Sequence, residues 1–205
     1  MDPLEVAGLR LGRTLGVAVA TEPVTGASRR AERQAGMVAV RSAFVAAGAR
    51  RDLGVVRHEQ DGRPCWPTGW TGSIAHTATH AVAAVSAVGV HDAVGIDIEE
   101  RRGLSLDDAA LVLDADEHDV ASRSTDPSDT ATLLWSAKEA AFKAWSTASG
   151  GLQGIDPVDI RIALGDGTFG AEAVDALADH ARSLGPLTGR YELTEDTVMT
   201  LVVRR

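Results

Sequence analysis

The chain has 205 residues and a single cysteine, Cys65, which excludes an internal disulfide framework and any metal cluster built from cysteines. Its formal net charge of -9 argues against a nucleic-acid surface, because binding phosphates needs a basic face. The acidic N-terminal residues are unlike a signal peptide, and the longest apolar run, residues 81–90, is too short to cross a bilayer, so we expect a cytoplasmic protein without a membrane partner.

The first half of the chain predicts a helix followed by strands. Apolar positions at helical spacing predict a helix over residues 27–49. Two prolines and three glycines in residues 61–73 indicate a long loop. Residues 80–88 and 93–100 are typical of two strands joined by a turn.

The second half repeats this order. We predict a helix over residues 105–121, a break at 124–129 and a second helix over 129–148, which ends at a glycine pair. Four strands follow, at residues 158–164, 168–174, 190–193 and 197–203. The order predicts an α+β fold built from two similar halves that meet near Gly95.

Carboxylates on one strand face are the first candidate site. Side chains two residues apart on a strand share a face, so Asp97 and Glu99 point the same way while Ile96 and Ile98 face the core. With Glu139 from the long helix they would form an all-oxygen ligand set suited to Mg²⁺. The alternative is an exposed strand end whose acids are simply solvated.

The only two lysines of the chain, Lys138 and Lys143, flank Glu139, although arginine occurs 18 times. A compact ammonium differs chemically from a planar guanidinium, so a retained lysine marks a position with a specific requirement. Glu139 and Lys143 are also spaced for an ordinary surface ion pair on a helix. We expect Lys138 to lie beside the aromatic core residues of this helix with its ammonium at the surface.

Two segments, "VGIDIEE" (94–100) and "WSAKEAAFK" (135–143), resemble the paired signature of the 4'-phosphopantetheinyl transferases. Two further segments, "GRPCWPTGWTGSIAH" (62–76) and "RRAERQAG" (29–36), resemble the enterobactin-synthetase component D branch of the Sfp-type group. The resemblance covers residues 29–145, and the chain length is typical of two-lobed, monomeric members. It implies two similar α/β lobes related by a pseudo-twofold axis, each a small, mainly antiparallel sheet on a long helix. Residues 1–95 would form the nucleotide side and residues 96–205 the metal side, with the active site between them.

The resemblance also implies a reaction. The phosphopantetheine arm of coenzyme A would move to a serine of an apo acyl or peptidyl carrier protein, releasing adenosine 3',5'-bisphosphate. The metal, Mg²⁺ or alternatively Mn²⁺, would bind Asp97, Glu99 and Glu139. Glu139 would accept the serine proton, and Lys143 would contact the pyrophosphate and stabilise or protonate the leaving group.

The positions that match coenzyme A contacts come from both halves of the chain. At Ala75 many members carry serine, so a contact there would have to come from the backbone. Arg101 and Arg102 form a candidate docking patch for the carrier protein. The implied coenzyme A contacts are Arg29, Arg30, Arg63, Ser73, Ala75, His76, Asp97 and Lys143.

Two other functions are compatible with the same residues. Three carboxylates and a lysine would also serve a Mg²⁺-dependent hydrolase of nucleotide pyrophosphates. A non-catalytic coenzyme A-binding protein would keep the fold without needing Glu139 for its role. The carrier protein implied by the resemblance would belong to siderophore, nonribosomal peptide or polyketide synthesis.

Overall fold

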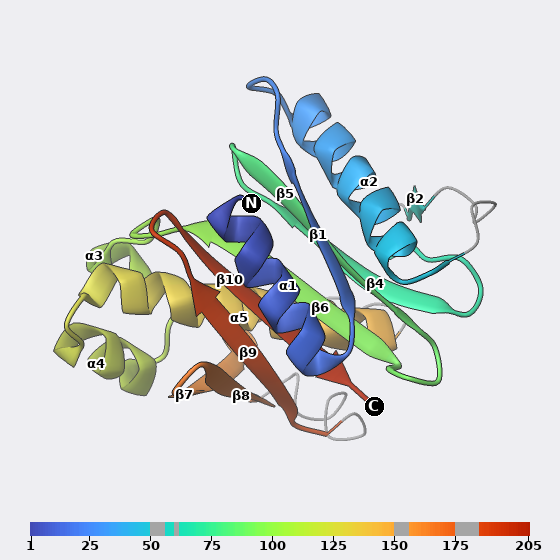
Figure 1. Cartoon of the computed structure of the whole chain (residues 1–205). Coiled ribbons are helices and arrows are strands. Elements are labelled where there is room, and N and C mark those ends of the chain that lie inside the picture. Colours follow the sequence, from blue (N-terminus) through green and yellow to red (C-terminus); the bar gives the residue numbers. More distant parts are fainter. Residues whose placement is uncertain (50–55, 60–61, 150–155, 175–184) are drawn as a thin grey trace.

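Two antiparallel sheets, each packed against a long helix, make up the α+β fold (Figure 1). The computed structural model describes residues 1–49, 56–59, 62–149, 156–174 and 185–205. The expected fold class is therefore confirmed. The expected lobe boundary at residue 95 falls inside strand β6 (Ala93–Glu100), which belongs to the second sheet.

The N-terminal sheet has the strand order β1-β5-β4 and carries helix α2 (Arg29–Ala46). Its strands are β1 (Ala18–Pro23), β4 (Trp70–His76) and β5 (His80–Ala87). The side chain of Ser28 caps α2 by accepting a hydrogen bond from the Ala31 amide, at 3.2 Å. A two-stranded ribbon of β2 (Arg57–His58) and β3 (Pro64–Cys65) lies between α2 and β4 in the chain.

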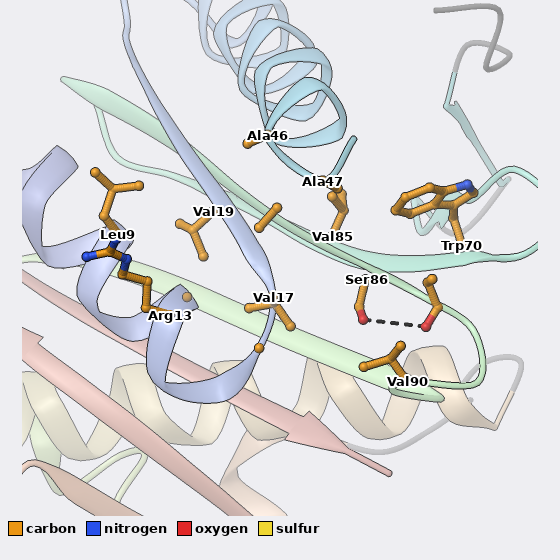
Figure 2. Close-up of a pocket in the computed structure, with 14 residues that line it drawn as sticks. Leu9, Arg13, Val17, Val19, Ala46, Ala47, Trp70, Val85, Ser86 and Val90 are labelled. Carbon is orange, nitrogen blue, oxygen red and sulfur yellow. Dashed lines mark hydrogen bonds between the residues drawn. The ribbon is translucent and has the colours of Figure 1, made fainter. Parts of the chain in front are cut away.

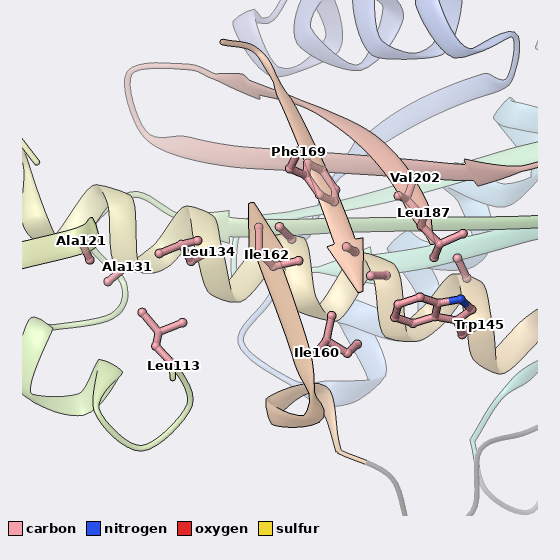
Figure 3. Packing of buried hydrophobic residues seen from close by; sticks show 14 of the residues in the cluster. Leu113, Ala121, Ala131, Leu134, Trp145, Ile160, Ile162, Phe169, Leu187 and Val202 are labelled. Carbon is pink, nitrogen blue, oxygen red and sulfur yellow. The ribbon is translucent and has the colours of Figure 1, made fainter. Parts of the chain in front are cut away.

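The second sheet has the order β6-β10-β9-β8-β7, and helix α5 (Pro127–Ala148) packs against it. Trp145 and Leu134 of α5 pack with Ile160, Ile162 and Phe169 from the sheet, as Figure 3 shows. Burial of this apolar surface holds the helix on the sheet. The remaining strands are β7 (Ile160–Gly165), β8 (Thr168–Ala173), β9 (Leu187–Leu193) and β10 (Thr197–Arg204).

Strands β4 and β6 meet where the two sheets come together. Gly95 on β6 makes a close approach to α5 possible, because a Cβ atom there would lie 1.9 Å from the carbonyl oxygen of Ala140. The helix can therefore lie directly on the strand only where residue 95 has no side chain. This contact places the polar residues of α5 over those of β6.

Two of the predicted elements were wrong or incomplete. The predicted helix over 105–121 is two helices, α3 (Leu106–Ala109) and α4 (Ala115–Arg123), because Asp114 and Glu117 form a capping box that starts a new helix. The predicted loop over 61–73 becomes strand β4 at Trp70. Gly72 fits this strand because there is no room for a side chain: a Cβ atom there would lie 2.5 Å from the Ala84 carbonyl oxygen.

Helix α1 (Pro3–Leu15) and strand β1 were not predicted. The signal for α1 was present: Asp2 caps the first turn, Pro3 opens it, and Gly16 ends it with φ of 75°. Helix α1 packs on β1 of the first sheet and on β9 and β10 of the second. It therefore connects the two halves on the side away from α5 (Figure 1).

Candidate active site between the two sheets

Asp97 lies at the centre of the candidate site, on β6 and under α5. The neighbouring Ile96 and Ile98 are buried in the apolar cluster on the opposite face, which confirms the predicted alternation. Asp97 is itself only 4% exposed, because α5 covers its face of the strand. For Asp97, the alternative of a solvated acid at an exposed strand end is therefore wrong.

Both carboxylate oxygens of Asp97 have a partner on α5. The ammonium of Lys143 donates to Oδ1 at 2.6 Å, and the hydroxyl of Ser136 donates to Oδ2 at 2.8 Å. The Lys143 Nζ atom also lies 3.9 Å from Oε2 of Glu139. Lys143 thus connects the strand carboxylate to the helix carboxylate, which a simple surface ion pair on one helix would not do.

Negative charge is in excess at this site. Burial, followed by the charge of Asp97, raises the pKa of Glu99 to about 7. Burial also raises the pKa of Glu139. Burial opposes the charge of Lys143, but the carboxylates of Asp97 and Glu139 outweigh it and raise the pKa of that lysine. Lys143 therefore stays an ammonium, which favours an electrostatic role over proton donation.

The side chains at this site offer the oxygen ligands that a hard divalent cation prefers. Three carboxylates, those of Asp97, Glu99 and Glu139, face one lysine, and oxygen ligands of this kind suit Mg²⁺. A divalent cation would relieve the repulsion that raises the two glutamate pKa values. Within the described residues, however, no three His, Cys, Asp or Glu side chains are already arranged to hold a metal ion. The Lys143 ammonium lies against two of the three carboxylates instead.

A cavity of about 280 Å³ lies between the first half of the chain and α5, and Lys143, the partner of Asp97, is one of the residues that line it. Residues of the first half, including Arg63 and Ser73, form one wall, and α5 forms the other with Phe142, Lys143 and Thr147. Three of the residues assigned to coenzyme A by resemblance, Arg63, Ser73 and Lys143, are thus brought to one cavity. Its position supports the expectation of a site between the two halves.

The other assigned residues lie along β4 and α2. The His76 side chain is at the end of β4, with Nδ1 3.8 Å from Oε2 of Glu32 on α2. Arg29 and Arg30 are exposed in the first turn of α2, where the helix dipole also favours an anion. The Ala75 methyl group is buried in the same apolar cluster as Ile96 and Ile98, so only the backbone of Ala75 is available for a ligand.

The structure corrects the prediction for Lys138. Its side chain is fully buried, and its ammonium forms an ion pair of 2.8 Å with Glu117 of α4 and donates to the carbonyl oxygen of Ile160. The ammonium of Lys138 is not at the surface, because α4 and β7 cover this face of α5. The two lysines therefore have separate roles, one in the core and one at the carboxylates. The neighbouring aromatics Trp135 and Phe142 are only partly buried.

Arg101 and Arg102 do not form an unpaired basic patch. Arg101 binds Asp129 and the carbonyl oxygen of Thr194, and Arg102 binds Asp126 at 2.7 Å. Their acidic partners neutralise much of the field that would attract an acidic protein. A docking role for these arginines stays a prediction.

A second cavity, of about 450 Å³, lies between α1, β1 and the end of α2 (Figure 2). Val17, Val19, Val85 and Val90 give it apolar walls, and Arg13 is the one charged side chain among the described residues that line it. None of its described lining residues contacts Asp97, Glu99 or Glu139 in a hydrogen bond or ion pair. The smaller cavity, lined by the Lys143 that pairs with Asp97, is therefore the better candidate for phosphate and metal chemistry.

Comparison with known proteins agrees with this geometry. The sequence pattern of the 4'-phosphopantetheinyl transferase superfamily matches residues 93–190, which include the strand and helix of the candidate site. The pattern of the 4'-phosphopantetheinyl transferase N-terminal domain matches residues 22–86. The chain belongs to the 4'-phosphopantetheinyl transferase superfamily. The predicted family resemblance is confirmed.

Several curated proteins are similar to the chain. Enterobactin synthase component D of Salmonella typhimurium is 37% identical over 124 residues, covering 59% of this chain and 50% of that protein. The 4'-phosphopantetheinyl transferase PptT of Mycobacterium tuberculosis is 31% identical over 69% of this chain and 65% of its own length. The 4'-phosphopantetheinyl transferase Svp of Streptomyces mobaraensis is 32% identical over 69% of this chain and 59% of its own length. The match with component D thus spans about half the length of that relative.

A solved structure, the holo-[acyl-carrier-protein] synthase of Thermotoga maritima, matches with a TM-score of 0.39 and 21% identity. The match covers 56% of this chain and 65% of the other. At this TM-score the likeness supports no further conclusion. None of the helices in the described ranges is both long and apolar enough to span a membrane.

Proposed function

We propose that the protein transfers the 4'-phosphopantetheine arm of coenzyme A to a serine of an apo acyl or peptidyl carrier protein, with adenosine 3',5'-bisphosphate as the second product. The observation that carries the proposal is the cluster of Asp97, Glu99, Glu139 and Lys143, in which Lys143 also lines a cavity between the first half of the chain and α5. The relatives named as phosphopantetheinyl transferases support it.

Asp97, Glu99 and Glu139 would hold the divalent cation, for which we propose Mg²⁺ with Mn²⁺ as the alternative. The bound cation would neutralise charge on the pyrophosphate of coenzyme A. Lys143, between Asp97 and Glu139, would add positive charge on the same side of the site. Electrostatic stabilisation of this kind is the main device of phosphoryl transfer.

Glu139 is the proposed general base. Its raised pKa makes it a better proton acceptor than an ordinary glutamate, and it lies one helical turn before Phe142 and Lys143, which line the cavity. The carrier serine loses its proton to Glu139 while its oxygen attacks the β-phosphorus. The bond from that phosphorus to the bridging oxygen breaks, and adenosine 3',5'-bisphosphate leaves.

The nucleotide end of coenzyme A would extend from the cavity along β4 toward α2. Arg63 and Ser73 line the cavity, and His76 lies at the end of the same strand. Arg29 and Arg30 at the start of α2 would bind the 3'-phosphate, for which exposed guanidinium groups at a helix N-terminus are suited. We further propose that the protein acts as a cytoplasmic monomer in which residues 1–95 supply the nucleotide side and residues 96–205 the metal side.

Product analysis separates this function from the two alternatives. Coenzyme A and Mg²⁺ are incubated with the protein, with and without an apo carrier protein, and adenosine 3',5'-bisphosphate is quantified by chromatography. The proposal predicts release only when the carrier is present. Release without the carrier would indicate a pyrophosphate hydrolase, and binding without any release would indicate a non-catalytic coenzyme A-binding protein.

A further inference from the structure

A buried pair of hydroxyl groups lies behind Asp97 and is not explained by packing alone. Ser136 of α5 and Thr200 of β10 are both 0% exposed. Their oxygens Oγ and Oγ1 are 2.9 Å apart, and Ser136 Oγ lies 2.8 Å from Asp97 Oδ2. Burying hydroxyl groups is unfavourable unless they are hydrogen-bonded, so their positions are strongly constrained.

The backbone brings these three residues together. Thr200 lies directly opposite Asp97 in the antiparallel pairing of β10 with β6, and residues opposite one another project to the same face. Gly95 lets α5 approach that face closely, which places Ser136 above both. The strand register and the helix approach therefore determine the contact together.

The direction of the hydrogen bonds follows from the number of protons. The carboxylate of Asp97, paired with the ammonium of Lys143, only accepts, so the single hydroxyl proton of Ser136 points to Asp97. Ser136 Oγ can then only accept from Thr200. The Thr200 proton is shared between Ser136 Oγ and the Ser136 carbonyl oxygen, which lies 2.9 Å away. The donor order is Thr200, then Ser136, then Asp97.

We infer that Ser136 and Thr200 are positioning residues that fix the carboxylate of Asp97 for metal binding. Ser136 holds Oδ2 from the buried side, which keeps Oδ1 on the side of Lys143. Thr200 prevents the Ser136 hydroxyl from turning to another acceptor. The inference rests on the proposed function, because it assigns these residues to the metal site of that reaction. Removing a partner that orients a metal ligand typically weakens metal affinity about 10–100-fold.

The test measures Mn²⁺ binding by electron paramagnetic resonance, with coenzyme A present and no carrier protein, so that it does not depend on turnover. We expect Ser136→Ala to weaken Mn²⁺ binding about 10-fold or more, and Thr200→Val to weaken it several-fold. Thr200→Ser restores the hydroxyl and should bind within about twofold of the wild type. Thr197→Val is the matched control, because Thr197 is buried on the same strand but its hydroxyl bonds Thr194, 2.7 Å away.

Thermal unfolding of each variant, without metal, separates positioning from loss of stability. Normal Mn²⁺ affinity in Ser136→Ala and Thr200→Val, or an equal loss in Thr197→Val, would overturn the inference. No Mn²⁺ binding by the wild type would overturn it too. If the wild type binds Mn²⁺ and the variants weaken it as expected, but no arm reaches a carrier protein, the proposed function fails while the positioning role stands.

Discussion

Replacing Lys138 by methionine should destabilise the protein severely. The change removes the ammonium from an ion pair in which the two side chains are 0% and 2% exposed. The Glu117 carboxylate cannot move to water, because its oxygens also accept hydrogen bonds from the backbone amides of Asp114, at 2.9 Å, and Ile162, at 2.7 Å. Glu117 therefore stays buried without a counter-charge.

The expected loss in the free energy of unfolding is about 3–5 kcal/mol, the usual cost of breaking a buried pair from one side. For a protein of this size, that lowers the melting temperature by about 6–20 °C. Urea unfolding followed by circular dichroism measures the loss. Because Lys138 also donates to the Ile160 carbonyl oxygen, the lost hydrogen bond adds to the cost.

Two controls make this prediction specific. Arg123→Met breaks an exposed ion pair with Asp119 on α4, whose side chains are 78% and 50% exposed, and should change stability by less than about 1 kcal/mol. The double variant Lys138→Met with Glu117→Gln removes both charges and should recover part of the loss. A Lys138→Met variant that loses less than about 1 kcal/mol would refute the reasoning.

Three further predictions concern the site. Gly95→Ala should cost about 3 kcal/mol in unfolding free energy, because its Cβ would lie 1.9 Å from the Ala140 carbonyl oxygen; a melting temperature equal to the wild type would contradict this. Without metal, stability should fall as the pH rises from about 4.5 to 7, because burial and then Asp97 raise the folded-state pKa of Glu99 to about 7 and the folded protein then holds the proton more tightly. Urea unfolding at pH 5 and 8 should show a smaller fall in Glu99→Gln, and equal falls would exclude Glu99 as the cause. Arg63→Gln should raise the KM for coenzyme A about 10-fold and leave the KM for carrier protein unchanged, measured by steady-state kinetics; the opposite pattern would place Arg63 on the carrier side.

The strongest local patterns predicted the elements of the site. The alternation around Asp97 gave β6, and the apolar spacing and caps gave α5 within two residues at its start. Both signals are local, because they depend on neighbours in the chain. Their meeting in space was inferred from the family signature, and the Lys143 contact to Asp97 agrees with it.

Contacts between distant segments could not be predicted in this way. Ser136 and Thr200 are 64 residues apart, and nothing in the local pattern pairs a helix serine with a strand threonine. The burial of Lys138 depends on Glu117 of α4, and α4 itself was merged with α3 in the prediction. A side chain with a long apolar stem fits the surface and the core equally well until its partner is known.

The most direct test of the central claim is the intact mass of an apo carrier protein after incubation with coenzyme A, Mg²⁺ and the protein. The account predicts a gain of about 340 Da with the wild type, which is one phosphopantetheine arm. It predicts the same gain with Glu195→Gln, an exposed turn residue, and none on the same time scale with Glu139→Gln. An unchanged carrier mass with the wild type, across acyl and peptidyl carrier proteins, would contradict the proposed transfer, and an equal gain with Glu139→Gln would contradict the role of Glu139.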